Sequence, residues 1–200
     1  MRKLPVLVTL IVVAAVATMI GLGIWQLQRA EWKNGLLETY AAARELPAIA
    51  YPAVPVEADA PYFRKSSVHC LEVVGWRSTS GRSASGQAGW AHIASCKTGG
   101  GEGPGAQIVA GWSETPDNPD WNGGLVDGVI APDSRSIVRL VASEPVAGLA
   151  QSQEPSLDDV PNNHMAYAIQ WFLFAGIAVV IYGLALRQRS RAAGKANDLP

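Results

Sequence analysis

Two long apolar stretches lie near the two ends of the chain, and shorter alternating patterns lie between them. Residues 4–28 contain no charged residue, and neither do residues 160–186. A helix of about 20 apolar residues is long enough to cross a bilayer. We therefore predict transmembrane helices over 4–28 and 164–186, a domain over 29–163 between them, and a short cytoplasmic tail over 187–200.

The first apolar stretch also has features of a secretory signal. Arg2 and Lys3 precede it, and Ala15-Val16-Ala17 resembles a cleavage site. However, the apolar run continues to Leu27, whereas the apolar region of a signal peptide has about 7–15 residues. We therefore expect a retained anchor rather than a cleaved signal.

The region after the first span is predicted to begin as a helix. Trp25, Arg29, Trp32 and Leu36 recur at helical spacing, and the helix is expected to reach Leu46. Four prolines then predict an extended linker, because proline cannot continue a helix. They are Pro47, Pro52, Pro55 and Pro61.

Beyond the linker, the pattern is typical of short β-strands separated by Gly- and Ser-rich turns. Strands are predicted at 68–77, 89–97, 106–112, 126–130 and 136–142. The Gly-rich segment at 99–105 is expected to be the tip of a hairpin. The predicted fold class is membrane α plus β, with N- and C-terminal transmembrane helices flanking an antiparallel β-rich barrel or sandwich.

Charge adds an orientation to this architecture. Only 16% of the 200 residues are charged, against about 25% in soluble domains. Arg29 to His164 contains 10 basic and 16 acidic residues, whereas basic residues flank the outer ends of both spans. The positive-inside rule predicts a two-pass protein of the cell inner membrane, with both termini cytoplasmic and the central domain periplasmic.

Several functional classes are disfavoured. The formal charge of −1 and the lack of a large basic patch argue against nucleic-acid binding. The segment at 99–105 lacks the Lys-Ser/Thr pair of a phosphate-binding loop, and residues 81–86 do not fit Gly-x-Ser-x-Gly. We therefore expect a protein that is not an enzyme.

The two cysteines leave three alternatives open. Cys70 and Cys96 would form a disulfide in an oxidising compartment. They would otherwise remain two unpaired thiols, or join His69 and His92 in a metal site. The metal alternative follows because His92 and Cys96 would share one face of a strand.

The most informative residues lie where the two spans meet the central domain. At the first border they are Trp25, Gln26, Arg29, Trp32 and Lys33. At the second border they are Asn162, Asn163, His164, Tyr167 and Trp171. One interpretation is an aromatic belt with a helix cap at Asn162 or Asn163. The other is a site for an amphipathic planar ligand, in which His164 coordinates iron and Arg29 pairs with a carboxylate.

The same residues carry a resemblance to a known family. Residues 22–33 resemble the signature Leu-Gly-x-Trp-Gln-x-x-Arg-x-x-Trp-Lys, and residues 161–172 resemble Asn-x-His-x-x-Tyr-Ala-x-x-Trp-Phe. Both signatures belong to the Surfeit locus protein 1 family of cytochrome c oxidase assembly factors. A middle segment keeps the Gly-Trp of that family at Gly111 and Trp112 but has Ala110 in place of an arginine, so no role of that arginine is carried over.

The resemblance implies a membrane-integral factor that assists the insertion of haem a into subunit I at the periplasmic border. The implied partners are subunit I and haem a synthase. The implied metal ligand is His164, which would bind haem a transiently. Further candidate cofactor-binding residues are Arg29, Trp25, Tyr167 and Trp171.

An alternative is a cofactor-free membrane scaffold or interaction protein for oxidase subunits. Ala17 and Gly21 are small residues spaced by four, a pattern that supports close packing of membrane helices. This alternative requires helix contacts but no bound haem.

Overall fold

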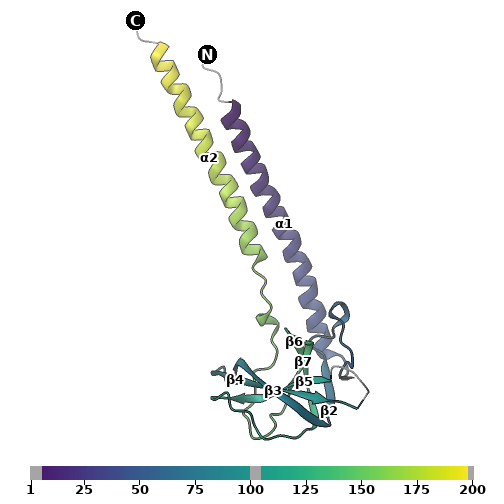
Figure 1. Ribbon diagram of the computed structural model, residues 1–200. Coiled ribbons are helices and arrows are strands. Elements are labelled where there is room, and N and C mark those ends of the chain that lie inside the picture. The colour runs from purple at the N-terminus through teal and green to yellow at the C-terminus, as the bar shows by residue number, and fades with distance from the viewer. Residues whose placement is uncertain (1–5, 100–104, 198–200) are drawn as a thin grey trace. The chain divides into compact units, whose positions relative to one another are not determined.

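Two long helices and one seven-stranded sheet form the part of the chain that the computed structural model describes, residues 6–99 and 105–197 (Figure 1). The contacts divide the chain into two compact units. One contains the residues up to Leu36 and those from Pro161 onward, and the other is Leu37–Val160. The first unit holds most of the two helices, and the second holds the sheet.

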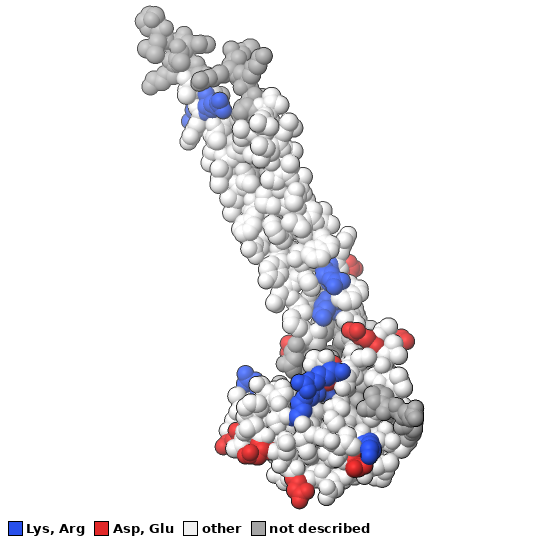
Figure 2. Space-filling model, viewed as in Figure 1, with Lys and Arg blue, Asp and Glu red and all other residues white. Residues whose placement is uncertain are grey.

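The helices are α1 (Val6–Glu45) and α2 (His164–Asn197). Each contains a window that is long and apolar enough to cross a membrane, and only 6% of each window is buried. The helix pair therefore presents apolar side chains outward, and its surface is white over most of its length in Figure 2. Such a surface suits lipid rather than water. The predicted helical continuation beyond Arg29 is confirmed, since α1 ends at Glu45.

The linker is mostly extended, as its prolines predict, but it also contains two short elements. β1 (Ile49–Ala50) pairs in parallel with β2 (Lys65–Cys70), and the 3-10 helix η1 covers Glu57–Asp59. Phe63 follows with a φ of 63° and a buried side chain. Its amide donates a hydrogen bond of 2.8 Å to the carbonyl of Ile130, which attaches the end of the linker to the sheet.

The sheet is mixed rather than purely antiparallel. Its order is β1-β2-β6-β7-β5-β4-β3. The remaining strands are β3 (Glu72–Arg82), β4 (Ala88–Lys97), β5 (Ala106–Ser113), β6 (Gly124–Asp133) and β7 (Ile137–Ala142). The pairs β1–β2 and β5–β7 are parallel, and the other four are antiparallel. The predicted class of terminal helices flanking a β-rich domain is confirmed, with this correction to the strand directions.

One predicted strand is wrong in extent. Residues 68–77 belong to the end of β2 and the start of β3, because the chain turns at Leu71. The amide of Leu71 donates to the carbonyl of Lys97 at 2.9 Å instead of continuing a ladder. The other predicted strands match β4 to β7 to within a few residues. β4 and β5 pair as the predicted hairpin, although residues 100–104 of its tip lie outside the described residues.

The sheet is strongly curled. Because β6, β7 and β5 lie between β2 and β4, a flat sheet would separate β2 from β4 by about 19 Å. Cys70 on β2 and Cys96 on β4 nevertheless form a disulfide, with Cα atoms 5.2 Å apart. The face carrying both cysteines is therefore the inside of the curl, which favours the predicted barrel over the sandwich.

This disulfide decides among the three alternatives for the cysteines. The unpaired-thiol alternative is wrong, because the two sulfurs are bonded to each other. The metal alternative is also wrong, since both ring nitrogens of His92 are hydrogen-bonded to serines. Nδ1 lies 3.2 Å from Oγ of Ser78, and Nε2 lies 2.8 Å from Oγ of Ser113.

Alternation along the strands produces buried apolar residues on both faces of the sheet. The inner face carries the larger cluster, which includes Val68, Ala94, Ile108, Ile130 and Leu140. The outer face carries a smaller cluster, which consists of Ala91, Ile93, Val109, Ala131 and Val141. The segment after β7 is attached by backbone hydrogen bonds to Ala110, Trp112 and Arg82, and it includes the 3-10 helix η2 (Leu157–Asp159).

Candidate functional site

The two helices of the first unit run antiparallel (Figure 1). Thr9 of α1 is hydrogen-bonded to Tyr182 of α2. Farther along, Gln26 of α1 is hydrogen-bonded to His164 of α2. The first bond joins the beginning of α1 to a late residue of α2, and the second joins the middle of α1 to the first residue of α2. The start of α2 therefore lies beside the middle of α1.

Small residues let the helices approach closely. Gly23 and Ala30 are buried on α1, and Ala168 and Ala175 are buried on α2 at 0% and 5% exposure. A Cβ atom added at Gly23 would lie 2.7 Å from the ring of Phe172. Each helix thus has two small residues seven positions apart. Residues with this spacing lie on the same side of a helix, so both can face the other helix of the pair.

Gly21 does not take part in the contact between α1 and α2, and the close packing of Ala17 and Gly21 against a membrane helix of another protein stays a prediction. No atom of the described residues lies within 4 Å of a Cβ position at Gly21 apart from its own local helix, and Ala17 is exposed. The contact lies two residues later, at Gly23. Spacing by four does not by itself select which of two nearby glycines faces the partner helix.

His164 is the first residue of α2 and lies against α1. Its Nδ1 is 2.8 Å from Oε1 of Gln26, and its side chain is partly buried. An amide oxygen only accepts hydrogen bonds, so Nδ1 of the neutral imidazole carries the proton and donates it to Gln26. Nε2 then keeps its lone pair, which is the arrangement found in imidazoles that bind metals.

Neighbouring asparagines hold the start of α2. Nδ2 of Asn162 donates to Oδ1 of Asn34 at 2.7 Å. Asn163 directly precedes α2, and its carbonyl accepts from the amide of Tyr167 at 3.2 Å, as expected for a cap residue. The start of α2, and with it the imidazole of His164, is therefore held in place by the bond from Asn162 to Asn34 of α1 and by the bond from Tyr167 to Asn163.

Trp25 and Arg29 lie on a different face of α1 from the contact with α2. Each precedes a residue of the contact face, Gln26 or Ala30, by one position, which is a rotation of about 100° around the helix. The guanidinium of Arg29 lies over the ring of Trp32, 4.4 Å from its centroid. Trp25 and Trp32 are 52% and 54% exposed, so these residues form an exposed aromatic and cationic stripe.

The aromatic candidates on α2 differ from each other in their surroundings. Tyr167 is 51% exposed. Trp171 is half-buried and packs edge-on against Phe174, with ring centroids 6.2 Å apart. The structure thus brings His164 together with Gln26, and it places Tyr167, like Trp25 and Arg29, on an exposed surface.

The arrangement around His164 suits one kind of metal centre. Within the described ranges, no group of three or more His, Cys, Asp or Glu side chains is placed to hold a metal ion. A single imidazole with a free lone pair is instead the donor of an axial haem ligand. His164, with Nδ1 bound to Gln26, therefore fits the haem group implied by the sequence.

The second unit contains a separate cluster of buried charges. The Asp133 side chain is 1% exposed, and its Oδ1 accepts from Nη2 of Arg77 at 2.8 Å. Its Oδ2 accepts from the amides of Arg135 and Ser136 at 3.1 Å. Burial acts to raise the pKa of Asp133, but Arg77 and the backbone bond outweigh it and hold that pKa below its ordinary value. Nη1 of Arg139 lies 3.9 Å from the same carboxylate, and burial lowers the pKa of Arg139.

Sequence reasoning did not assign roles to Gln26 and Asn34. Gln26 belongs to the first signature, but a signature does not show which residue of another helix it faces. One signal was present in the sequence. Gln26 lies three residues after Gly23 and four before Ala30, so all three share one helical face.

The comparisons with known proteins agree with the resemblance seen in the sequence. The model of the SURF1 family matches residues 13–176, a span that contains both signature strings and the whole sheet. No curated protein matches the chain. The SURF1 family is known for assembly factors of cytochrome c oxidase, and it is not a catalytic family.

Proposed function

The chain belongs to the SURF1 family of cytochrome c oxidase assembly factors, and on this premise we propose that it assists the insertion of haem a into subunit I. The observation that carries the proposal is the hydrogen bond between His164 and Gln26, because it directs the lone pair of Nε2 away from the amide. The site would act at the periplasmic border of the inner membrane.

His164 would hold haem a through its iron as an axial ligand. A transient carrier must bind haem tightly enough to prevent its loss, yet more weakly than the final site in the oxidase. A single imidazole, rather than a closed pair of ligands, suits that requirement. Gln26 would keep the imidazole in one tautomer and one orientation, as hydrogen-bond partners of metal-binding histidines do.

The exposed stripe on α1 and the aromatic residues on α2 would complete the site. Arg29 supplies a cation that can pair with a carboxylate of the haem periphery. Trp25, Tyr167 and Trp171 supply flat apolar surface for a planar ligand. The proposed partners are subunit I, which receives the haem, and haem a synthase, which supplies it.

The direct test is the haem content of variants purified from cells that make haem a. We expect His164→Ala to lose most of the copurifying haem while still inserting into the membrane. His69→Ala is the matched control, because His69 is an exposed histidine on β2, and it should keep the wild-type haem content. Wild-type haem content in His164→Ala would remove this residue from the site.

A cofactor-free scaffold is the second candidate, and the open space at Gly21 beside the exposed Ala17 supports it, because a helix of another subunit could approach α1 closely there. The haem a content of the oxidase from a deletion strain distinguishes the two. A haem carrier predicts oxidase subunits that lack haem a. A scaffold predicts fewer assembled oxidase complexes, each with its normal haem a content, and haem-free purified protein.

A further inference from the structure

The two edges of the sheet are protected to different degrees. β1 forms one edge and has only two residues, with Pro52 shortly after it, so it offers little free backbone. β3 forms the other edge and has eleven residues. Its irregularity lies between Val73 and Gly75, whereas residues 76–80 pair regularly with β4 and include no proline. Native proteins usually shorten, bend or cover such an edge, so the edge at 76–80 is a candidate surface for a partner.

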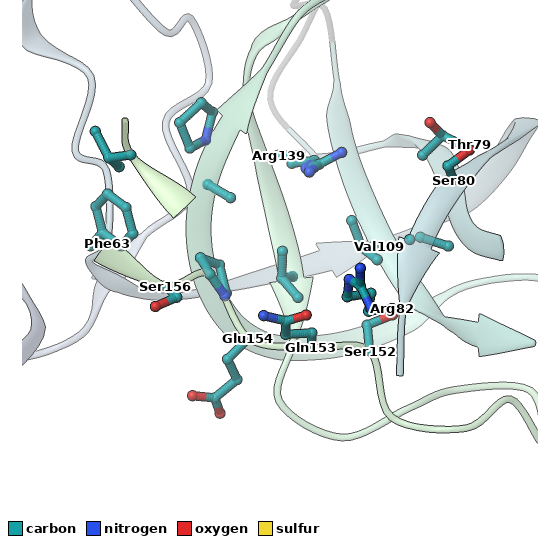
Figure 3. A pocket seen from close by; sticks show the side chains of 17 residues that line it. Phe63, Thr79, Ser80, Arg82, Val109, Arg139, Ser152, Gln153, Glu154 and Ser156 are labelled. Atoms are coloured by element: carbon teal, nitrogen blue, oxygen red, sulfur yellow. The ribbon is translucent and has the colours of Figure 1, made fainter. Parts of the chain in front are cut away.

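The side of β3 that faces away from β4 is already paired near its end. The carbonyl of Arg82 accepts from the amide of Gln153 at 2.9 Å, and the amide of Ala84 donates to the carbonyl of Gln151 at 2.8 Å. The segment after β7 thus adds a short antiparallel stretch beside β3, and Gln153 lies near Arg82 in Figure 3. The next residue in register is Pro155, which has no amide hydrogen to donate. The added stretch therefore stops there.

Farther along the same side, β3 keeps unpaired peptide groups. Peptide groups point alternately to the two sides of a strand, so those of Trp76, Ser78 and Ser80 point to the same side as that of Arg82. Among the residues that the structure describes, no backbone group pairs with them on this side. Free amides and carbonyls at sheet spacing match the backbone of an extended peptide, which can add to a sheet edge as a further strand.

Side chains on the outer face of the sheet add a charge preference. The guanidinium groups of Arg77 and Arg139 share the buried carboxylate of Asp133. Arg82 lines a cavity on this face, whereas the carboxylate of Glu154 points away from that cavity (Figure 3). Cations therefore predominate beside the edge on the outer face, and an added strand would gain from acidic side chains there.

The inner face has a different preference. Trp76 packs against the inner cluster, and its ring centroid lies 6.3 Å from that of Trp121. Burial lowers the pKa of His92, and the nearby carboxylate of Asp117 acts against this shift. An acidic side chain on this face would approach Asp117, so the inner face favours apolar side chains.

We propose that the edge of β3 at 76–80 binds an extended segment of a partner protein in which acidic and apolar residues alternate. The segment would pair antiparallel to β3, as the stretch at 151–153 does. Its acidic side chains would lie beside Arg77, and its apolar side chains would lie beside Trp76. This inference does not depend on haem binding.

The test is the binding of labelled peptides to the full chain in detergent, measured by fluorescence anisotropy. The probe is a blocked peptide of eight alternating Glu and Val residues. We expect saturable binding of this peptide, and binding at least about 10-fold weaker for the Lys and Val counterpart, which carries the opposite charge on the same apolar residues.

N-methylation of the probe tests the backbone pairing. In an antiparallel pair, opposite residues share a face and exchange their hydrogen bonds, so the valines would direct their amides to β3. N-methylation of the valines should abolish binding, and N-methylation of the glutamates should preserve it. Equal affinities of the two methylated peptides would overturn the pairing.

Two substitutions at Ser80 assign the binding to the edge. Ser80→Pro removes an amide that does not pair with β4, so the sheet should keep its fold while peptide binding weakens at least about 10-fold. Ser80→Ala keeps the amide and should bind as the wild type does. Arg82→Gln should weaken binding several-fold. Arg135→Gln is its control, since Arg135 is exposed and does not line the cavity.

Thermal unfolding checks the fold of each variant. If Ser80→Pro does not fold, the methylated peptides and Arg82→Gln decide the test. Equal binding by folded Ser80→Pro and Ser80→Ala would overturn the proposal, as would the absence of saturable binding of the Glu and Val peptide to the native chain. Dimers of the native chain that disappear in Ser80→Pro, measured by light scattering, would assign the edge to a second copy instead.

Discussion

At the scale of single residues, the acceptor on Gln26 determines how His164 presents its second nitrogen. Gln26→Leu removes this acceptor but keeps a side chain of similar size, so the imidazole loses its fixed tautomer and orientation. We expect the affinity for haem a to fall about 10–100-fold, as is typical when a metal-binding histidine loses its hydrogen-bond partner. Spectroscopic haem titration of the purified protein measures this change.

Gln28→Leu is the control for that experiment, because Gln28 is exposed on another face of α1. Its haem affinity should equal that of the wild type. Equal losses in the two variants would show that general damage to the helix, rather than the hydrogen bond to His164, causes the effect.

Asp133 makes a second prediction, which concerns stability. Asp133→Asn leaves Arg77 and Arg139 without their carboxylate, and breaking a buried ion pair from one side costs about 3 kcal/mol or more. We expect a lower urea midpoint for the sheet unit, measured in the full chain by tryptophan fluorescence. Asp127→Asn on the same strand is exposed and should keep the wild-type midpoint.

The pH dependence of the same variant has a definite sign. The folded pKa of Asp133 lies below its ordinary value of 3.8, so the stabilisation from its ionised form is complete above that value. It is lost as the pH falls through the lower folded pKa. The urea midpoint of Asp133→Asn should therefore depend less on pH in this acid range than the wild-type midpoint. Identical pH profiles would contradict the assigned role.

Only some residues of the candidate site could be predicted from the sequence. His164, Trp25 and Arg29 stand out because their types and spacings match a signature. The contact of Gln26 with His164 depends on the rotation and offset of two helices separated by more than a hundred residues, and no local pattern specifies these.

At the scale of elements, Gly23 limits how closely α1 and α2 approach. A side chain at Gly23 would collide with the ring of Phe172, whereas a side chain at Gly21 has open space. We expect Gly23→Leu to separate the helices near His164 and Gly21→Leu to leave them in place. Cysteines introduced at Asn34 and Asn162, whose side chains are 2.7 Å apart, report the separation through their cross-linking yield with a short thiol reagent.

The native cysteines do not interfere with this measurement, because Cys70 and Cys96 are buried in a disulfide. We expect the cross-linking yield to fall severalfold in Gly23→Leu and to be unchanged in Gly21→Leu. Loss of yield in Gly21→Leu alone would show that the helices contact each other through the other face of α1.

The elements themselves were predicted best where local pattern and length suffice. The charge-free runs predict both helices, and alternation locates β4 to β7 within a few residues. The break at Leu71 was missed because the apolar pattern continues through the turn, whereas the turn is set by the disulfide and by the bond from Leu71 to Lys97. The parallel pairing of β5 with β7 was missed because it depends on which distant strands meet when the sheet curls.

At the scale of the whole molecule, the distribution of charge predicts an orientation that can be measured with reporters. Basic residues follow the apolar span of α2, at Arg187, Arg189 and Arg191 in the last part of the helix, and acidic residues predominate between the two helices. We expect alkaline phosphatase inserted at 118–119, between β5 and β6, to be active, since this enzyme folds only in an oxidising compartment. The same reporter fused after α2 should be inactive, and a green fluorescent protein fused there should fluoresce.

Replacing the three arginines by glutamine should raise the phosphatase activity of the fusion after α2, because it weakens the retention of that end in the cytoplasm. Replacing the exposed Lys65, Arg82 and Arg135 of the sheet unit by glutamine removes the same charge and should leave the reporter activities unchanged, since those residues do not flank a span. An active fusion after α2 in the native chain would reverse the orientation and place the proposed haem site on the cytoplasmic side.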